Sequence, residues 1–245
     1  MSVAVKDAID PNSKNRYRNA RRHADYTIDQ DWPSYSAAEH DRWDRLFRRS
    51  HAILHDRACD EFVTMMNTLK LSESGVPNME RLSDRLEKLT GWRVVPVAEL
   101  VPDDVFFNHL ANRRFPAGAF IRSEQEMDYL EEPDIFHDVF GHVPLLANPV
   151  YANFMQAYGK GGQRAIALSR LPNLARLYWY TVEFGVIRTA AGLRIFGRYH
   201  VVHNGKRLRA GKRLAQSHRL RARARHAHQI SDRRFSADLF CDRKL

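Results

Sequence analysis

Two histidines, His137 and His142, lie five positions apart in the segment YLEEPDIFHDVFGHVPLL, residues 129–146. On an α-helix with 3.6 residues per turn, this spacing places the two side chains about 140° apart around the axis. The spacing is wider than the i, i+4 pair of H-E-x-x-H zinc proteases. Both imidazoles can still reach one metal ion if a third ligand comes from elsewhere. The pair alone leaves open a role without metal, because a core histidine is usually just hydrogen-bonded.

Glu183 is the candidate third ligand, in the aromatic-rich segment LYWYTVEFG, residues 177–185. A carboxylate between two apolar neighbours is costly to bury unless a cation pairs with it. A metal ion could be that cation, and so could Arg176 or Arg188. Two histidines and one carboxylate on one face of an ion form the facial triad of non-haem Fe(II) oxygenases, which leaves coordination positions open. The same donors also suit zinc in a hydrolase.

The elements that must position these ligands are predicted to be mainly α-helices with a few short strands. Apolar residues recur at three- to four-residue spacing from a Ser36–Glu39 capping box to about residue 70, which predicts one long helix. The glycine-rich stretch at residues 159–162 predicts a turn. Further helices are expected at 79–89, from residue 102, from 132–134, at 150–158 and at 172–187. Strands are expected at 93–97, late in 113–122 and at 193–196.

Composition bounds the class of protein. The chain has 245 residues, of which 44% are hydrophobic, enough for one domain with a real core. Cys59 and Cys241 form no C-x-x-C motif, so we predict neither a disulfide framework nor a thiolate zinc site. The first residues lack the apolar core of a signal peptide, and no apolar run approaches the roughly 18 residues of a membrane span. We therefore expect a cytoplasmic location.

The net charge of +10 is concentrated at one end of the chain. Residues 198–245 hold 14 of the 39 Lys and Arg and 3 of the 29 Asp and Glu, so they carry +11 and the remainder carries −1. A basic arm could bind nucleic acid, but its aromatic residues are few and not interleaved with the arginines. We expect no nucleic-acid partner. The chain divides into a mobile N-terminal segment (1–31), a catalytic domain (32–197) and an atypical basic tail (198–245).

The two segments that carry the candidate ligands resemble signatures of the pterin-dependent aromatic amino acid hydroxylases, especially the short bacterial members that act on phenylalanine. The resemblance covers residues 32–197. It implies a single hydroxylase-like catalytic domain whose three iron ligands are His137, His142 and Glu183. It implies an oxidoreductase in which Fe(II) and a tetrahydropterin, tetrahydrobiopterin or a similar one, activate O2. One oxygen atom would convert phenylalanine to tyrosine, and the other would leave on the pterin. Tryptophan or tyrosine as substrate is the alternative within this chemistry.

The resemblance also assigns the substrate-binding residues. Arg122 would hold the substrate carboxylate with a fork of donors, and Asp134 would orient it. Without the resemblance, Arg122 would be an ordinary surface residue after a strand, and Asp134 would simply start a helix. The walls of the pocket for the aromatic ring would be Pro133, Trp179 and Phe184. The last two would otherwise be assigned to the core.

The pterin would bind beside a loop. The resemblance assigns contacts to Leu100 and Val101, with Phe106 stacking on the pterin ring and Asp138 approaching it from the ligand helix. Asp138 could equally be a solvated helix residue. Three residues stand where the family loop often has Gly and Ser: Glu99, Pro102 and Asp103. With no regulatory segment or coiled coil apparent, we expect a monomer.

After residue 197 the sequence departs from the family pattern. The expected Gly-Ala-Gly-Ile-x-Ser-Ser strand is absent, and with it a serine of the pocket. Suitable codons for residues 214–220, read one base later, encode Ser-Pro-Asn-Arg-Ile-Gly, and the same offset turns 198–202 and 229–240 into family-like segments. We interpret 198–245 as the product of a changed reading frame. An inactive remnant with a basic tail is the corresponding alternative function.

Overall fold

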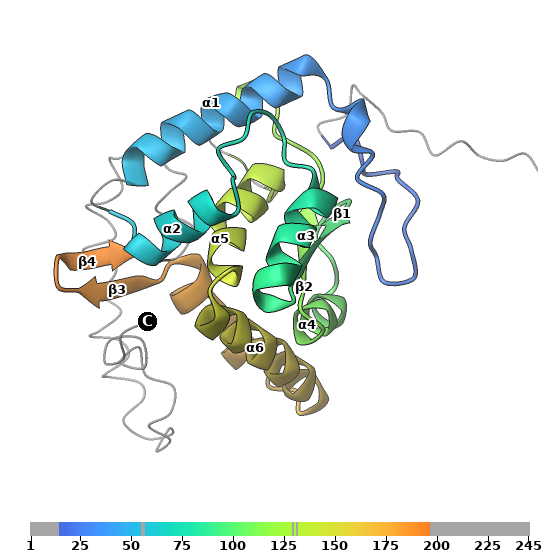
Figure 1. The fold of residues 1–245 in the computed structure, drawn as a ribbon. Helices are drawn as coiled ribbons and strands as arrows, with labels where there is room; N and C mark the ends of the chain where they lie inside the picture. The colour runs from blue at the N-terminus through green and yellow to red at the C-terminus, as the bar shows by residue number, and fades with distance from the viewer. Residues whose placement is uncertain (1–14, 55–56, 129, 131, 197–245) are drawn as a thin grey trace, which may run out of the picture.

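The computed structural model describes residues 15–54, 57–128, 130 and 132–196 (Figure 1). Its helices are α1 (Ala37–Leu54), α2 (Asp60–Thr68), α3 (Met79–Thr90), α4 (Asp103–Ala111), α5 (Val143–Leu146), α6 (Pro149–Ala167) and α7 (Leu171–Tyr178). Short 3-10 turns lie at Trp32–Ser34 and Glu124–Glu126, and π-helical turns lie at Phe136–Phe140 and Trp179–Glu183. Strands β1 (Arg93–Val97) and β2 (Arg114–Gly118) pair in parallel, and β3 (Val186–Thr189) and β4 (Gly192–Ile195) form an antiparallel hairpin. The predicted mainly α fold with few short strands is confirmed.

The short helix α5 lies near the centre of the fold (Figure 1). Helices α1 and α2 lie on one side of it, α3 with β1 and β2 on another, and α6 runs beneath. Elements α3, β1 and β4 match their predicted ranges within two residues, and α4 begins at Asp103, one residue after its predicted start. The strand expected late in 113–122 lies at its start. Among the described residues, no helix is both long and apolar enough to cross a membrane.

The start of α1 follows the predicted capping box. The Glu39 backbone N–H donates to Ser36 Oγ at 3.3 Å, and the Ser36 N–H donates to Glu39 Oε2 at 2.7 Å. The prediction of one helix to residue 70 is wrong, because α1 ends at Leu54 and α2 begins at Asp60. Between them the backbone bonds to β4 instead: the Cys59 N–H donates to the Ile195 carbonyl at 2.9 Å. A pairing partner 136 positions away interrupts a pattern that is locally helical.

Residues 15–31 are packed on the body, so the prediction of a mobile segment up to residue 31 is wrong for this part. The side chains of Tyr17 and Ile28 are buried. The Asn15 side chain donates to the Ala98 carbonyl at 2.6 Å, and Thr27 forms an antiparallel bridge with Val97. Residues 1–14 and the tail 198–245 lie outside the described residues.

The glycines at 159–162 lie inside α6 and do not form the predicted turn. Gly159 and Gly162 make the face on which α4 packs. A Cβ at Gly162 would overlap the ring of Phe107, and one at Gly159 would overlap the α4 backbone at Leu110 and Ala111. Glycine is unfavourable within a helix, but here it permits a close approach of two helices that a local turn pattern does not reveal.

This packing predicts opposite effects at two neighbouring glycines. Gly162→Ala is expected to destabilise the fold by about 2 kcal/mol, since the methyl group must displace the Phe107 ring. Gly161→Ala is the matched control, because nothing lies within 4 Å of its added Cβ; it should stabilise the helix by roughly 0.5–1 kcal/mol. Urea denaturation of the two variants checks the difference. Equal shifts of both midpoints would contradict the close packing of α4 on α6.

Candidate metal and substrate site

The two histidines meet across a π-helical turn and not on a regular α-helix. His137 lies within the turn Phe136–Phe140, and His142 follows it. A π-helix closes its hydrogen bonds between residues i and i+5, so residues five apart come onto one face. The centroids of the two imidazole rings are 5.4 Å apart. The wide separation expected for an α-helix is therefore wrong, and the local geometry favours a shared ion more than the spacing alone suggested.

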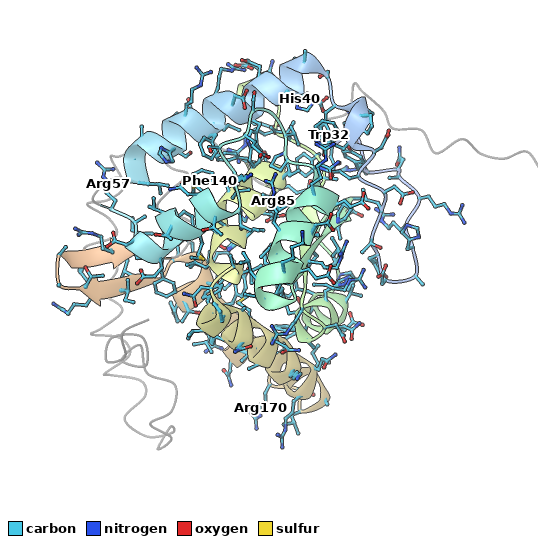
Figure 2. The ribbon with its side chains drawn as sticks, in the orientation of Figure 1. Trp32, His40, Arg57, Arg85, Phe140 and Arg170 are labelled. Atoms are coloured by element: carbon cyan, nitrogen blue, oxygen red, sulfur yellow. The ribbon has the colours of Figure 1, made fainter. Side chains whose placement is uncertain are left out.

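An aromatic cluster holds this turn from behind. The rings of Phe136 and Phe140 stack with centroids 4.7 Å apart, and Trp43 of α1 meets Phe136 edge-on at 5.2 Å. All three side chains are fully buried, and Figure 2 shows Phe140 in the interior of the fold, below α1 in this view. Large rings packed in this way leave little freedom for the backbone that carries the histidines.

Glu183 comes from a second π-helical turn, Trp179–Glu183, which follows α7. Its Oε2 lies 3.3 Å from His142 Nε2, and its Oε1 lies 3.9 Å from His137 Nε2. The predicted third donor is thus brought to the histidines, and one ligand atom from each of the three residues lies within 4.8 Å of the others. Glu183 is 6% exposed, whereas the alternative partners Arg176 and Arg188 are exposed residues.

The site contains buried ring nitrogens that lack a hydrogen-bond partner among the described residues, as expected for metal ligands. Both ring nitrogens of His142 are buried and have no hydrogen-bond partner among the described residues. A buried nitrogen without a partner is costly, and an ion bound at Nε2 would satisfy the one that faces Glu183. His137 Nδ1 lies 2.7 Å from Asp138 Oδ1. A carboxylate at Nδ1 fixes the ring and leaves Nε2 to bind metal, as in other histidine sites.

Asp138 is held on both sides and is not a freely solvated helix residue. Its Oδ2 accepts a hydrogen bond from the Gly118 N–H at 2.8 Å, while its Oδ1 faces His137. Asp138 thereby connects the end of β2 to a candidate ligand. Its predicted approach to a pterin stays a prediction.

Arg122 and Asp134 form a buried ion pair beside this turn. Arg122 Nε and Nη2 donate to the two carboxylate oxygens of Asp134, each at 2.8 Å, and the side chains are 2% and 0% exposed. The reading of Arg122 as a surface residue is wrong. Burial alone would raise the pKa of Asp134, but the charge and hydrogen bonds of Arg122 hold it below the ordinary value.

Asp134 also accepts a hydrogen bond from the His137 N–H at 2.9 Å. One carboxylate therefore orients Arg122 and starts the turn that carries the histidines. Arg122, Asp134 and His137 thus form a chain of contacts from a candidate substrate-binding residue to a candidate metal ligand.

The predicted wall residues lie at an open face. The rings of Trp179 and Phe184 stack with centroids 5.4 Å apart. Trp179 is 54% exposed and Phe184 is half-buried, so Trp179 is not a core residue. Pro133 is also half-buried. A flat, partly exposed aromatic surface is suited to an aromatic ligand.

The predicted pterin loop leads from the surface to the metal ligands. Leu100 is 72% exposed, and with Val101 it lines a hollow of about 230 Å³. The Phe106 ring meets Tyr178 edge-on with centroids 5.9 Å apart, and Tyr178 lies 6.1 Å from the His142 ring. Phe106 thus presents a half-buried aromatic surface close to the site.

Tyr178 was not among the predicted site residues. Burial, and then the negative charge of Glu183, raises its pKa well above the ordinary value, so its hydroxyl stays protonated near the site. A signal for it existed, because Tyr178 and Glu183 are five positions apart, as are His137 and His142. Both segments form π-helical turns, and in such a turn residues five apart come onto one face.

Comparison with known proteins agrees with this geometry. The family model described as "Biopterin-dependent aromatic amino acid hydroxylase" matches residues 7–240. Phenylalanine-4-hydroxylases from Caulobacter vibrioides and Ralstonia nicotianae are 64% and 58% identical to this chain over 173 residues, 71% of it. A crystal structure of the Chromobacterium violaceum phenylalanine hydroxylase with bound iron(III) and 7,8-dihydrobiopterin is 50% identical, with a TM-score of 0.73, over 76% of this chain and 68% of that one.

The extent of the match is informative in itself. The family model extends beyond the predicted range 32–197 in both directions, and the packed residues 15–31 agree with this at the N-terminal side. The chain spans 59% and 55% of the lengths of the two curated relatives. The changed reading frame after residue 197 stays a prediction.

Proposed function

Because the chain belongs to the biopterin-dependent aromatic amino acid hydroxylase family, we propose that it is an iron- and tetrahydropterin-dependent monooxygenase that converts L-phenylalanine and O2 to L-tyrosine. The observation that carries the proposal is the convergence of His137, His142 and Glu183 within 4.8 Å. Two imidazoles and one carboxylate are the donor set of non-haem Fe(II) oxygenases. When bound, the iron and the reduced pterin would supply the electrons and the activation of O2.

The residues of the chain have separate tasks in this proposal. Arg122, fixed by Asp134, binds the carboxylate of the amino acid with its remaining guanidinium donors. The stacked rings of Trp179 and Phe184 lie beside the substrate ring and exclude water from one side of it. Asp138 holds His137 in the tautomer that presents Nε2 to the metal.

The choice of phenylalanine is supported by the relatives, which are named phenylalanine-4-hydroxylases. The test is tyrosine formation by the full chain with Fe(II), a tetrahydropterin and O2, with tryptophan and tyrosine as competing substrates. We expect phenylalanine to be the preferred substrate. Hydroxylation of tryptophan at a higher kcat/KM would overturn the assignment of substrate.

Metal exchange separates an oxygenase from a zinc hydrolase with the same ligands. Chelation followed by Fe(II) should restore tyrosine formation, whereas Zn²⁺ should occupy the site without restoring it, since zinc has no accessible redox change. The reaction should also stop when O2 is removed. Product formation with Zn²⁺ under anaerobic conditions would exclude the proposed chemistry.

We also propose a monomer located in the cytoplasm that does not bind nucleic acid. The near-neutral balance of residues 1–197 supports the last point. Light scattering after size exclusion and cell fractionation test the first two. Salt-dependent DNA binding that disappears on deletion of residues 198–245 would contradict the third.

For the tail, we propose that residues 198–245 are encoded in a changed reading frame. The family-like segments at three places in one alternative frame support this. Sequencing of the coding DNA tests it, and a gene in which no single frame change restores those segments would refute it. A chain translated from a gene with the restored reading frame should form tyrosine faster than the chain as written, because it regains the serine of the substrate pocket.

A further inference from the structure

The turn that carries Glu183 is lightly packed on its N-terminal side. Helix α7, which precedes the turn, contains no buried residue. Trp179 and Tyr180, the first two residues of the turn, are 54% and 56% exposed. Within the turn only Val182 and Glu183 are buried. Residues that follow Glu183 must therefore supply much of the support for its position.

Gly185, two positions after Glu183, is closely covered by Phe196 at the end of the β3–β4 hairpin. A Cβ at Gly185 would lie 2.4 Å from Cζ of the Phe196 ring and 2.1 Å from the Thr181 carbonyl oxygen. The Phe196 N–H also donates to the Gly185 carbonyl at 3.1 Å. Glycine permits this close approach of ring and backbone, so the end of the hairpin packs directly on the backbone that leads from Glu183.

The hairpin is itself anchored to the connection between α1 and α2, beside the start of α2 (Figure 1). The Ile195 N–H donates to the Arg57 carbonyl at 2.7 Å, and the Cys59 N–H donates to the Ile195 carbonyl at 2.9 Å. Ile195 pairs with Val186 in the hairpin, and its side chain is buried. These bonds fix the residue that immediately precedes Phe196, and they thereby fix where its ring meets Gly185.

Two parts of the fold must therefore meet for the three candidate ligands to converge. His137 and His142 belong to the central turn that the packed rings of Phe136 and Trp43 support. Glu183 reaches them from the turn that the hairpin supports, and its Oε2 lies 3.3 Å from His142 Nε2. Metal–ligand distances vary by only about 0.2 Å in well-formed sites, so a small displacement of the second turn is enough to weaken metal binding.

We propose that Phe196 is a positioning residue for Glu183. Its ring covers Gly185 and closes the anchored hairpin on the turn, which holds the third ligand against the two histidines. The inference rests on the proposed function and adds to it a long-range contact, from residues 57–59 through β4, on which metal binding depends. All of these contacts lie before residue 198, where the atypical tail begins.

Titration of the full chain with Co²⁺ tests the proposal without turnover, because Co²⁺ takes the same kinds of donor as Fe²⁺ and its visible absorption reports the ligand geometry. Phe196→Ala should raise the Kd for Co²⁺ roughly tenfold, as expected for loss of a group that supports a ligand, and should change the absorption spectrum. Phe196→Leu keeps an apolar side chain over Gly185 and should restore most of the affinity. Leu193→Ala is the matched control, because Leu193 lies on the same hairpin and is 48% exposed.

Gly185→Ala disturbs the same contact from the other side. Its methyl group overlaps both the Phe196 ring and the Thr181 carbonyl, so Co²⁺ binding should weaken at least as much as in Phe196→Ala. Val76→Ala controls for a general loss of stability. Val76 is buried, and its hydrogen-bond partners, His40 and Trp32, lie at the end of α1 remote from the hairpin (Figure 2). It should leave the Kd and the spectrum unchanged.

The outcomes separate the inference from the proposed function. An unchanged Kd and spectrum in Phe196→Ala would show that the ring does not position Glu183, and so would an equal loss of affinity in Val76→Ala; the proposed function would stand in both cases. If the parent chain does not bind Co²⁺, or binds it equally well after His142→Ala, the three donors do not form the metal site and the proposed function fails together with this inference.

Discussion

Replacing His142 with alanine is expected to abolish stoichiometric iron binding and, with it, any tyrosine formation. The reason is the position of His142 Nε2, which is buried, unsatisfied among the described residues and 3.3 Å from Glu183 Oε2. A change to a group that only supports a metal ligand costs about 10–100-fold in metal affinity, so loss of a ligand should exceed about 100-fold. Anaerobic titration with Fe(II), followed by metal analysis of the dialysed chain, measures this.

Two further variants make the result specific to the ligand. His51→Ala removes an exposed histidine on α1 that stacks on Phe47, and it should leave iron binding unchanged. Asp138→Asn keeps the His137 ring in place with a weaker partner, so an intermediate loss of about 10–100-fold is expected. Retention of stoichiometric iron by His142→Ala would show that the three donors do not form the metal site.

The buried pair of Arg122 and Asp134 should give the largest effect on stability. Asp134→Ala leaves the guanidinium of Arg122 buried without its partner, which costs about 3–5 kcal/mol of unfolding free energy. It also removes the acceptor for the His137 N–H. Urea denaturation monitored by circular dichroism should show this loss directly.

The chain offers a matched control for this prediction. Asp128 pairs with Arg49 at 2.6 Å, but the two side chains are 76% and 34% exposed. Because an exposed pair contributes at most about 1 kcal/mol, Asp128→Ala should have little effect. Similar losses for Asp128→Ala and Asp134→Ala would mean that burial does not set the energy of the pair.

Arg122→Lys tests the binding role separately from stability. Lysine keeps the positive charge beside Asp134 but loses the planar fork of donors. The KM for phenylalanine should therefore rise about tenfold, the equivalent of one charge-assisted hydrogen bond, while iron binding is retained. An unchanged KM would place the substrate carboxylate elsewhere.

Several features of this chain could be predicted from its order of residues because they depend on near neighbours. The Ser36–Glu39 capping box and the Gly91 end of α3, where φ is +73°, are local hydrogen-bond and backbone effects. The candidate ligands His137, His142 and Glu183 were also identified in advance, since their chemical types and signature segments are properties of the sequence.

Other features arose from contacts between distant segments. Pairing of Cys59 with Ile195 divides a pattern that favours one helix, and the packing of α4 on Gly159 and Gly162 makes helix out of an apparent turn. Residues 15–31 are polar in sequence, yet they pack against the end of β1 and the residue that follows it, Ala98. The two π-helical turns are held by packed aromatic rings, and their geometry brings the donors within reach of one ion. Periodicity describes which face of an element is apolar, but the partner that covers that face, and the exact turn it enforces, depend on the assembled fold.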